Sequence, residues 1–245
     1  MSAATLEVEE REDRVVVTLN RPEARNAINA AMIGELHDVC ALLERRPRML
    51  LLTGAGGAFA GGADIAELRE RGREEALRGI NSRLFDRIAK LPLPTVAAVD
   101  GYALGGGAEL AYACDLRIAS HTAVFGNPEP GLGILAGAGA CWRLGALVGG
   151  SVAKQVLLAG RSLDAADALR FGLVADVVEP ADLPARAHAM LDRMGRSSPA
   201  ALRLTKLVLD APGAHPLADD LAQAVLFETE DKRDRMTRFL ERRRS

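Results

Sequence analysis

Two short, uninterrupted apolar runs each lead into a glycine-rich loop. The runs are RMLLLTG at residues 48–54 and TVAAVDG at residues 95–101, and a third run rich in β-branched residues, RVVVTLN, covers residues 14–20. A strand that is buried on both faces lacks the alternation of apolar and polar residues. The first two runs therefore predict strands that are buried on both faces, and the β-branched third run predicts a further strand.

Helical patterns separate these runs. Residues 28–46 place apolar side chains three and four positions apart, which is typical of an amphipathic helix. A second helical stretch runs from Asp64 to Lys90 with an interruption near Gly72, and GAELAYAC predicts a buried helix. Further strands are expected in DLRIAS and AVFG, at residues 115–120 and 123–126. Strands that alternate with helices predict an α/β fold with right-handed crossovers.

The pattern becomes mostly helical from about residue 136. GLVADVV at residues 172–178 is the one further strand candidate, and Ser198 is the expected N-cap of a later helix. We therefore expect two parts: an α/β core over residues 1–195 that carries the site, and a helical C-terminal region over residues 196–245.

Composition excludes several classes of protein. The formal net charge of the 245 residues is −2, so there is no overall electrostatic case for nucleic acid, although the C-terminal tail is basic. The polar, acidic N-terminus resembles neither a signal nor a transit peptide, and no apolar run approaches the ~20 residues that cross a membrane. The four histidines lack metal-ligand spacing, so no metal site is expected.

Three cysteines without C-x-x-C spacing (Cys40, Cys114 and Cys141) are expected to be buried thiols in a reducing, cytoplasmic compartment.

Both glycine loops lie where a predicted strand passes into a predicted helix. They are AFAGGADI and GYALGGGAEL. Glycine lets another group approach the main chain closely, and the N–H groups at a helix start point outward. Two such N–H donors that converge form a site for an oxygen that gains negative charge during a reaction. The alternative is that both loops are tightly packed turns, in which glycine is needed only because a side chain would not fit.

Two glutamates stand near these loops. Glu109 lies in the apolar helix start AELAYA, and Glu129 follows twenty residues later in FGNPEPG. Glu109 can serve as an ordinary carboxylate near a helix N-terminus. If the fold brings both carboxylates to one water molecule, they can act as a general acid and base. Spacing across an intervening strand does not establish that proximity.

The sequence resembles the enoyl-CoA hydratase/isomerase family, the crotonase superfamily. Six motifs carry the resemblance in the family's order over some 225 residues. They are LNRPEARNAI, LLLTGAGGAFAGGADIAEL, PTVAAVDGYALGGGAELAYACDLRIAS, FGNPEPGLGILAGAGACWRL, AGRSLDAADALRFGLVADVV and FETEDKRDRMTRFLERR.

The resemblance implies a spiral of repeated ββα turns, followed by a helical region that builds trimers, commonly paired into hexamers. It implies that the N–H groups of Ala63 and Gly106 hold the oxygen of a thioester enolate. It further implies that Glu109 and Glu129 orient a water that adds to a 2-enoyl-CoA, with coenzyme A supplied by the substrate and no separate cofactor. The implied CoA and substrate contacts are Arg21, Ala24, Arg25, Gly61, Asp64, Ile65, Gly105 and Trp142, of which Arg25 can face a CoA phosphate or solvent.

Two alternatives stay open. One is an enoyl-CoA isomerase, in which a single glutamate moves a double bond and no water is added. The other is a non-catalytic binding protein on the crotonase scaffold. Two departures from the family's commonest hydratase pattern bear on the acyl substrate: Pro130 follows Glu129 and pushes it toward an extended backbone, and Trp142 stands where a small or polar residue is usual.

Overall fold

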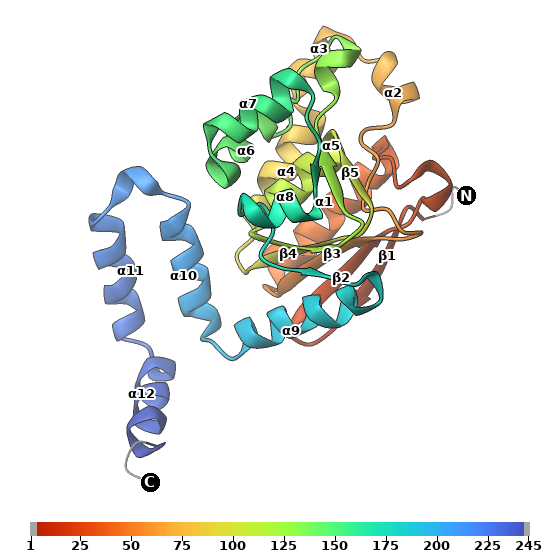
Figure 1. The fold of residues 1–245 in the computed structure, drawn as a ribbon. Helices are drawn as coiled ribbons and strands as arrows, with labels where there is room; N and C mark the ends of the chain where they lie inside the picture. Colours follow the sequence, from red (N-terminus) through yellow and green to blue (C-terminus); the bar gives the residue numbers. More distant parts are fainter. Residues whose placement is uncertain (1–3, 243–245) are drawn as a thin grey trace.

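A large sheet of six strands forms the centre of the protein, which we describe from a computed structural model over residues 4–242. Figure 1 shows how the helices surround it. Its strand order is β1-β2-β3-β4-β6-β9, and every pairing is parallel except that of β1 with β2. The strands are β1 (Leu6–Glu10), β2 (Arg14–Leu19), β3 (Met49–Gly54), β4 (Thr95–Val99), β6 (Leu116–Ser120) and β9 (Val177–Val178). All five residues of β4 and the first four of β3 are buried, which confirms the predicted interior strands.

A second, three-stranded sheet has the order β5-β7-β8. Its strands are β5 (Tyr102–Leu104), β7 (Val124–Gly126) and β8 (Leu163–Asp164). The chain passes from β4 to β5 and then into a helix, and from β6 to β7 and then toward another helix. These two repeats are the ββα turns of a spiral, and the mixed α/β fold is confirmed.

Helices cover the core, and their apolar faces explain their placement. They are α1 (Ala30–Arg45), α2 (Ile65–Arg69), α3 (Arg73–Arg78), α4 (Ile80–Ala89), α5 (Gly106–Ala113), α6 (Ala140–Val148), α7 (Gly150–Ala159) and α8 (Ala165–Arg170). In α1 the Asn29 side chain accepts a hydrogen bond from the Met32 N–H at 2.9 Å, so the helix starts at a true N-cap. Leu36 and Leu43 then lie in the main core at no more than 1% exposure.

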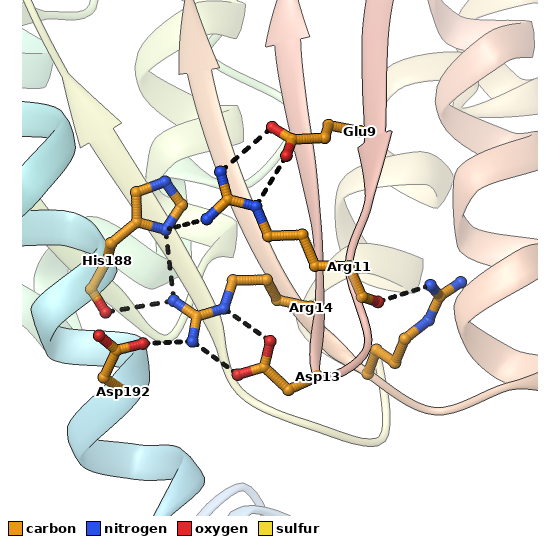
Figure 2. Close-up of polar contacts among 7 residues, drawn as sticks. Glu9, Arg11, Asp13, Arg14, His188 and Asp192 are labelled. Carbon is orange, nitrogen blue, oxygen red and sulfur yellow. Dashed lines mark hydrogen bonds and ion pairs between the residues drawn. The ribbon is translucent and has the colours of Figure 1, made fainter.

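Helix α9 (Leu183–Gly195) packs on the face of the large sheet that is opposite to helix α1. Leu183, Ala187 and Leu191 form a separate apolar cluster with residues of β3, β4 and β6. A polar network attaches the same helix to the β1–β2 hairpin (Figure 2): Arg14 Nη1 donates to the main-chain oxygen of His188 at 3.2 Å, and Arg14 pairs with Asp192.

Helices α10 (Pro199–Leu209), α11 (Leu217–Phe227) and α12 (Glu230–Arg242) reach away from the core (Figure 1). Ser198 caps α10 by accepting the Ala201 N–H at 3.4 Å, as the sequence predicts. The buried Lys206 of α10 donates to Asp115 at 2.7 Å and ties the start of this region to the core. The proposed division near residue 195 coincides with the end of α9 and stays a prediction.

Two expectations need correction. Strands β1, β5 and β8 were not predicted, because β5 and β8 have only three and two residues and four of the five residues of β1 are exposed, so none of them forms an apolar run. Cys141 is exposed, whereas Cys40 and Cys114 are buried as expected, because Cys141 follows the first residue of α6 on a face that the core does not cover.

Candidate active site

The segment from Ala60 to Asp64 is held between two other stretches of chain. On one side Gly61 donates its N–H to Arg25, Ile28 donates to Gly62, and Asp64 donates to Ile28, at 2.8–2.9 Å. On the other side the Ala60 N–H bonds to Tyr102 and the Leu104 N–H to Ala60, both at 3.0 Å. Main-chain groups alternate in direction along an extended segment. Since Gly62 and Asp64 bond to Ile28, the N–H of Ala63 faces away from it.

The Ala63 N–H lies close to the start of helix α5. A Cβ built at Gly106, the first residue of α5, would be 3.4 Å from the Ala63 nitrogen. Within residues 4–242, neither the Ala63 N–H nor the Gly106 N–H donates a hydrogen bond to another group of the protein. The first N–H groups of a helix have no partner inside the helix and attract an anion. Two unpaired donors from separate segments thus lie together.

The two outer glycines of the Gly105–Gly107 run are required by their surroundings. A Cβ at Gly107 would be 2.2 Å from the main-chain oxygen of Ala60, so only glycine lets α5 approach this segment. Gly105 has a φ of +50°, and its Cβ would be 3.1 Å from Glu129 Oε1. The run therefore brings α5 against the Ala60–Asp64 segment and leaves room for the carboxylate of Glu129.

Helix α5 is buried along its whole length, from Gly106 to Ala113. At its C-terminal end the buried guanidinium of Arg117 donates to the main-chain oxygens of Ala111 and Cys114, at 3.2 and 2.7 Å. A cation at this end complements the helix dipole. Helix α5 is thereby fixed at its C-terminal end by Arg117 and at its N-terminal end by the close packing of Gly107 on Ala60.

Glu109 lies one turn into α5 and is 3% exposed. Its Oε1 atom accepts the N–H groups of Ala138 and Ala140, at 2.7 and 3.1 Å. Burial raises the pKa of Glu109 to about 7, the N–H donors lower it, and the neighbouring charge of Glu129 raises it. A carboxyl group whose pKa is near neutrality can both accept and donate a proton.

Glu129 begins a short 3₁₀ turn, η2 (Glu129–Leu132), just after strand β7. The expectation that Pro130 makes Glu129 extended is wrong, because Gly133 and Ile134 donate their N–H groups back to the start of the turn and close it. The turn buries the Glu129 side chain, which is 7% exposed.

The Glu129 carboxylate has one bound and one unbound oxygen. Oε1 accepts the side-chain amide of Asn127 at 3.4 Å. Oε2 is buried and has no hydrogen-bond partner in the described chain. Burial raises the pKa of Glu129, while its own main chain and Asn127 lower it. An unpartnered buried carboxylate oxygen calls for a ligand or a water.

A pocket of about 340 Å³ opens beside the Ala63 N–H. Five of the predicted contact residues and the predicted oxyanion residue Ala63 line it, together with Ala27, Ala66, Tyr102 and Leu104. The five are Ala24, Arg25, Gly61, Asp64 and Ile65.

Three predicted contact residues lie outside this pocket. Arg21 donates to the Ala27 main-chain oxygen at 2.6 Å and to Asp64 at 3.2 Å, so it connects the segment before α1 to the start of α2. Gly105 faces Glu129 instead. Trp142 is 52% exposed beside Arg143, whose guanidinium carbon is 5.0 Å from the centre of its ring. Asp64 lines the pocket and also caps α2, because its side chain accepts the Ala66 N–H at 3.2 Å.

Sequence reasoning missed the groups that hold the two carboxylates. They are the main-chain N–H groups of Ala138 and Ala140 and the side chain of Asn127, to which Tyr112 in turn donates. Asn127 stands two residues before Glu129, which is a usable signal. The role of the Ala138–Ala140 main chain leaves no side-chain signature.

A ββα spiral with two unpaired N–H donors close together beside a pair of buried carboxylates is the arrangement expected of the crotonase class. The Enoyl-CoA hydratase/isomerase family model matches residues 9–245, and the chain belongs to that family.

Individual relatives agree with the family. The chain is 40% identical over 252 residues to the short-chain-enoyl-CoA hydratase of Clostridium acetobutylicum, covering 96% of this chain and 94% of that protein. It is 37% identical to the crotonyl-CoA hydratase of Syntrophomonas wolfei, over 100% of this chain and 98% of the relative. The crystal structure of an enoyl-CoA hydratase from Bacillus anthracis superposes with a TM-score of 0.92 at 30% identity, covering 97% and 96% of the two chains.

Proposed function

We propose that this protein is an enoyl-CoA hydratase that adds water across the 2,3 double bond of a 2-enoyl-CoA thioester. One observation carries the proposal: the buried carboxylates of Glu109 and Glu129 lie beside two unpaired main-chain N–H groups. Relatives with hydratase names over nearly the whole chain support it.

In the proposed reaction the thioester oxygen accepts the N–H groups of Ala63 and Gly106. Glu109 and Glu129 hold a water between them. As the water oxygen bonds to C3, one carboxylate takes a proton from the water, and the electrons of the double bond move onto the thioester oxygen. The enolate that forms is stabilised by the two N–H donors. Its electrons return to C2, which takes a proton from a glutamate, so the net change is the addition of one water.

The pocket beside Ala63 is the proposed site of the CoA part of the substrate. Arg25, at its rim, supplies a positive charge for a phosphate, and Ala24, Gly61 and Ile65 offer main chain and apolar surface. CoA enters as part of the substrate, and water and two carboxylates suffice for the chemistry, so we propose that no cofactor takes part. Among residues 4–242 no three His, Cys, Asp or Glu side chains gather as a metal site.

We propose that the chain assembles as a homotrimer or a dimer of trimers in the cytoplasm. Helices α10–α12 leave large apolar side chains 46–71% exposed, and a second copy of the chain would cover them. They are Leu207, Leu209, Leu217, Leu221, Val225, Phe227, Met236, Phe239 and Leu240. Sedimentation equilibrium of the native protein and of a Leu221→Asp/Val225→Asp variant tests the proposed assembly, and a monomeric native protein contradicts it.

Across residues 4–242, every helix is too short or too polar to cross a lipid bilayer.

Incubation with crotonyl-CoA tests the activity. Hydration removes the conjugated enoyl-thioester absorbance, and the Glu109→Gln/Glu129→Gln double variant serves as the inactive control. If the absorbance stays but a 3-enoyl-CoA is converted, the protein is an isomerase and the hydratase proposal is wrong.

The oxyanion site has its own test. Gly106→Pro removes one N–H donor at a first helical position, where proline is tolerated, and should lower kcat by about 10²–10³-fold. Gly150→Pro makes the same change at the first residue of α7, where a Cβ meets no atom within 4 Å, and should keep kcat. Equal kcat values for the two variants would contradict the role of Gly106.

A further inference from the structure

The hydroxyl of Tyr112 is buried next to the acid pair. Tyr112 lies three residues after Glu109 on α5 and is 3% exposed. Its hydroxyl donates to Asn127 Oδ1 at 3.3 Å. Residues three apart are neighbours on a helix surface. The helix that carries Glu109 therefore also reaches the segment that carries Glu129.

Asn127 connects Tyr112 to Glu129. It is 3% exposed, and its Nδ2 donates to Glu129 Oε1 at 3.4 Å while its Oδ1 accepts from Tyr112. A side-chain amide has an acceptor end and a donor end. A hydroxyl can bind either end of an amide, so the carboxylate of Glu129 selects the donor end, and the hydroxyl holds the other end in place. Without the hydroxyl, the Asn127 amide would keep only its hydrogen bond to Glu129 among the contacts of the described residues.

A loosened amide would change Glu129. The hydrogen bond from Asn127 favours the charged carboxylate and lowers the pKa of Glu129, so a weaker bond would favour the protonated form. In the observed orientation the amide ties Oε1 and leaves Oε2, which has no partner in the described residues, as the oxygen available to a ligand. The placement of the amide thus affects which oxygen is held and which protonation state is favoured.

We propose that Tyr112 is a positioning residue for Glu129: its hydroxyl fixes the Asn127 amide so that Glu129 stays an oriented carboxylate with Oε2 free. The inference rests on the proposed hydratase function for its kinetic consequences. The orientation itself does not depend on the reaction.

Other titratable groups surround this chain of contacts. Glu109 on α5 and Glu129 interact by charge, and the charge of Arg117 on β6 acts on Tyr112. Burial and then the charges of both glutamates raise the pKa of Cys141 on α6. Because the charge of Glu129 acts on Glu109, a pH profile of activity reports the two groups together, and a site-specific probe is also needed.

The first experiment is Tyr112→Phe, which keeps the ring and removes the hydroxyl. Both contacts are long, so we expect a modest loss in kcat, roughly three- to tenfold, with KM unchanged and the pH–kcat profile displaced to higher pH. Thr53→Val is the matched control, since it removes a hydroxyl that donates to the Ala98 main-chain oxygen at 3.1 Å elsewhere in the core. It should lower Tm without displacing the profile. A Tyr112→Phe profile that coincides with the native one overturns the proposal.

A double-mutant cycle with Asn127→Ala tests the route. If Tyr112 acts through Asn127, then Tyr112→Phe has no further effect on kcat in the Asn127→Ala background. Independent, multiplicative losses would mean that Tyr112 does not act through Asn127.

The second readout needs no activity. Carboxyl carbons of ¹³C-labelled glutamate are titrated by NMR, and the Glu129 signal is assigned with Glu129→Gln. In Tyr112→Phe the Glu129 titration should move to higher pH, and in Thr53→Val it should not. If crotonyl-CoA is not hydrated but the titration moves, only the proposed function fails. If hydration occurs and the titration stays in place, only the role of Tyr112 is wrong.

Discussion

Glu109 and Glu129 are held in different ways, although both are buried at one site. Glu109 projects from a regular helix, and two main-chain N–H groups bind one of its oxygens. Glu129 projects from a 3₁₀ turn, and a single side-chain amide binds one of its oxygens. Main-chain donors persist whatever side chains Ala138 and Ala140 carry. The position of Glu109 thus depends on backbone shape, and that of Glu129 on the identity of neighbouring side chains.

The largest expected effect tests whether both carboxylates take part in the reaction. Glu109→Gln and Glu129→Gln should each lower kcat by about 10²–10⁴-fold, the usual contribution of general acid–base catalysis. Binding of a CoA thioester should survive, because the pocket beside Ala63 is unchanged. Steady-state kinetics with crotonyl-CoA measures the first effect and calorimetric titration the second. Near-native turnover of either variant would contradict the shared-water mechanism.

The next effect concerns stability and pH. Burial raises the pKa of Glu109 to about 7 from the ordinary value of 4.5, so the folded state binds this proton more tightly than the unfolded state. The contribution of the Glu109 proton to the free energy of unfolding is complete below about pH 4.5 and is lost as pH rises through 7. Glu109→Gln keeps an oxygen for both N–H donors and avoids the buried charge. At pH 8 it should stabilise the protein by on the order of 3 kcal/mol relative to the native chain.

Thermal unfolding at pH 4 and pH 8 measures that difference. The exposed Glu12→Gln is the control, and its Tm should follow that of the native protein at both pH values. If Glu109→Gln gave no gain at pH 8, Glu109 would not carry a buried charge there.

A pair of glycine substitutions should separate the two kinds of support. Gly139 has a φ of +148° between the donors Ala138 and Ala140, and Gly139→Ala should cost about 1–3 kcal/mol and weaken the bonds to Glu109. Fewer N–H donors raise the pKa of Glu109, so the pH–kcat profile should move upward. Gly105→Ala instead places a methyl group 3.1 Å from Glu129 Oε1 and should lower kcat by displacing that carboxylate.

Gly160→Ala is the matched control for both substitutions. Gly160 ends α7 with a φ of +69°, and a Cβ there meets no atom within 4 Å, so the substitution adds strain without contact at the site. It should reduce Tm and keep the pH–kcat profile. If Gly160→Ala displaced the profile as much as Gly139→Ala does, backbone strain alone would explain the effect.

The smallest effect concerns the turn under Glu129. Pro130→Ala should lower the free energy of unfolding by about 0.4–1 kcal/mol, because alanine leaves the unfolded chain more freedom. The hydrogen bonds that Gly133 and Ile134 donate back to Glu129 and Pro130 remain, so kcat should stay within about twofold. Denaturant unfolding and kinetics measure the two quantities. A tenfold loss of kcat would mean that proline itself orients Glu129.

The interior strands and the helix with Glu109 could be predicted because their signal is local. Runs such as MLLL and TVAAV are apolar throughout, which is enough to indicate a strand buried on both faces. The family resemblance predicted the spiral, which local patterns alone did not. The roles of Ala63, Gly106, Glu109 and Glu129 stay predictions until they are measured.

The contacts that hold the carboxylates could not be predicted from local patterns. Tyr112 and Asn127 are fifteen residues apart, and Ala138 lies 29 residues after the Glu109 that it binds. Such contacts depend on how separate turns of the spiral pack. The 3₁₀ turn at Glu129 was missed for a similar reason, since later residues close it and outweigh the preference of a residue that precedes proline.

The complete burial of α5 has a consequence for how the protein loses activity. A helix without any solvent-facing side cannot fray while its surroundings stay intact, so the amide hydrogens that are bonded within it should exchange with solvent only when the whole core opens. Displacement of Gly106 and Glu109 by denaturant should then coincide with unfolding of the core.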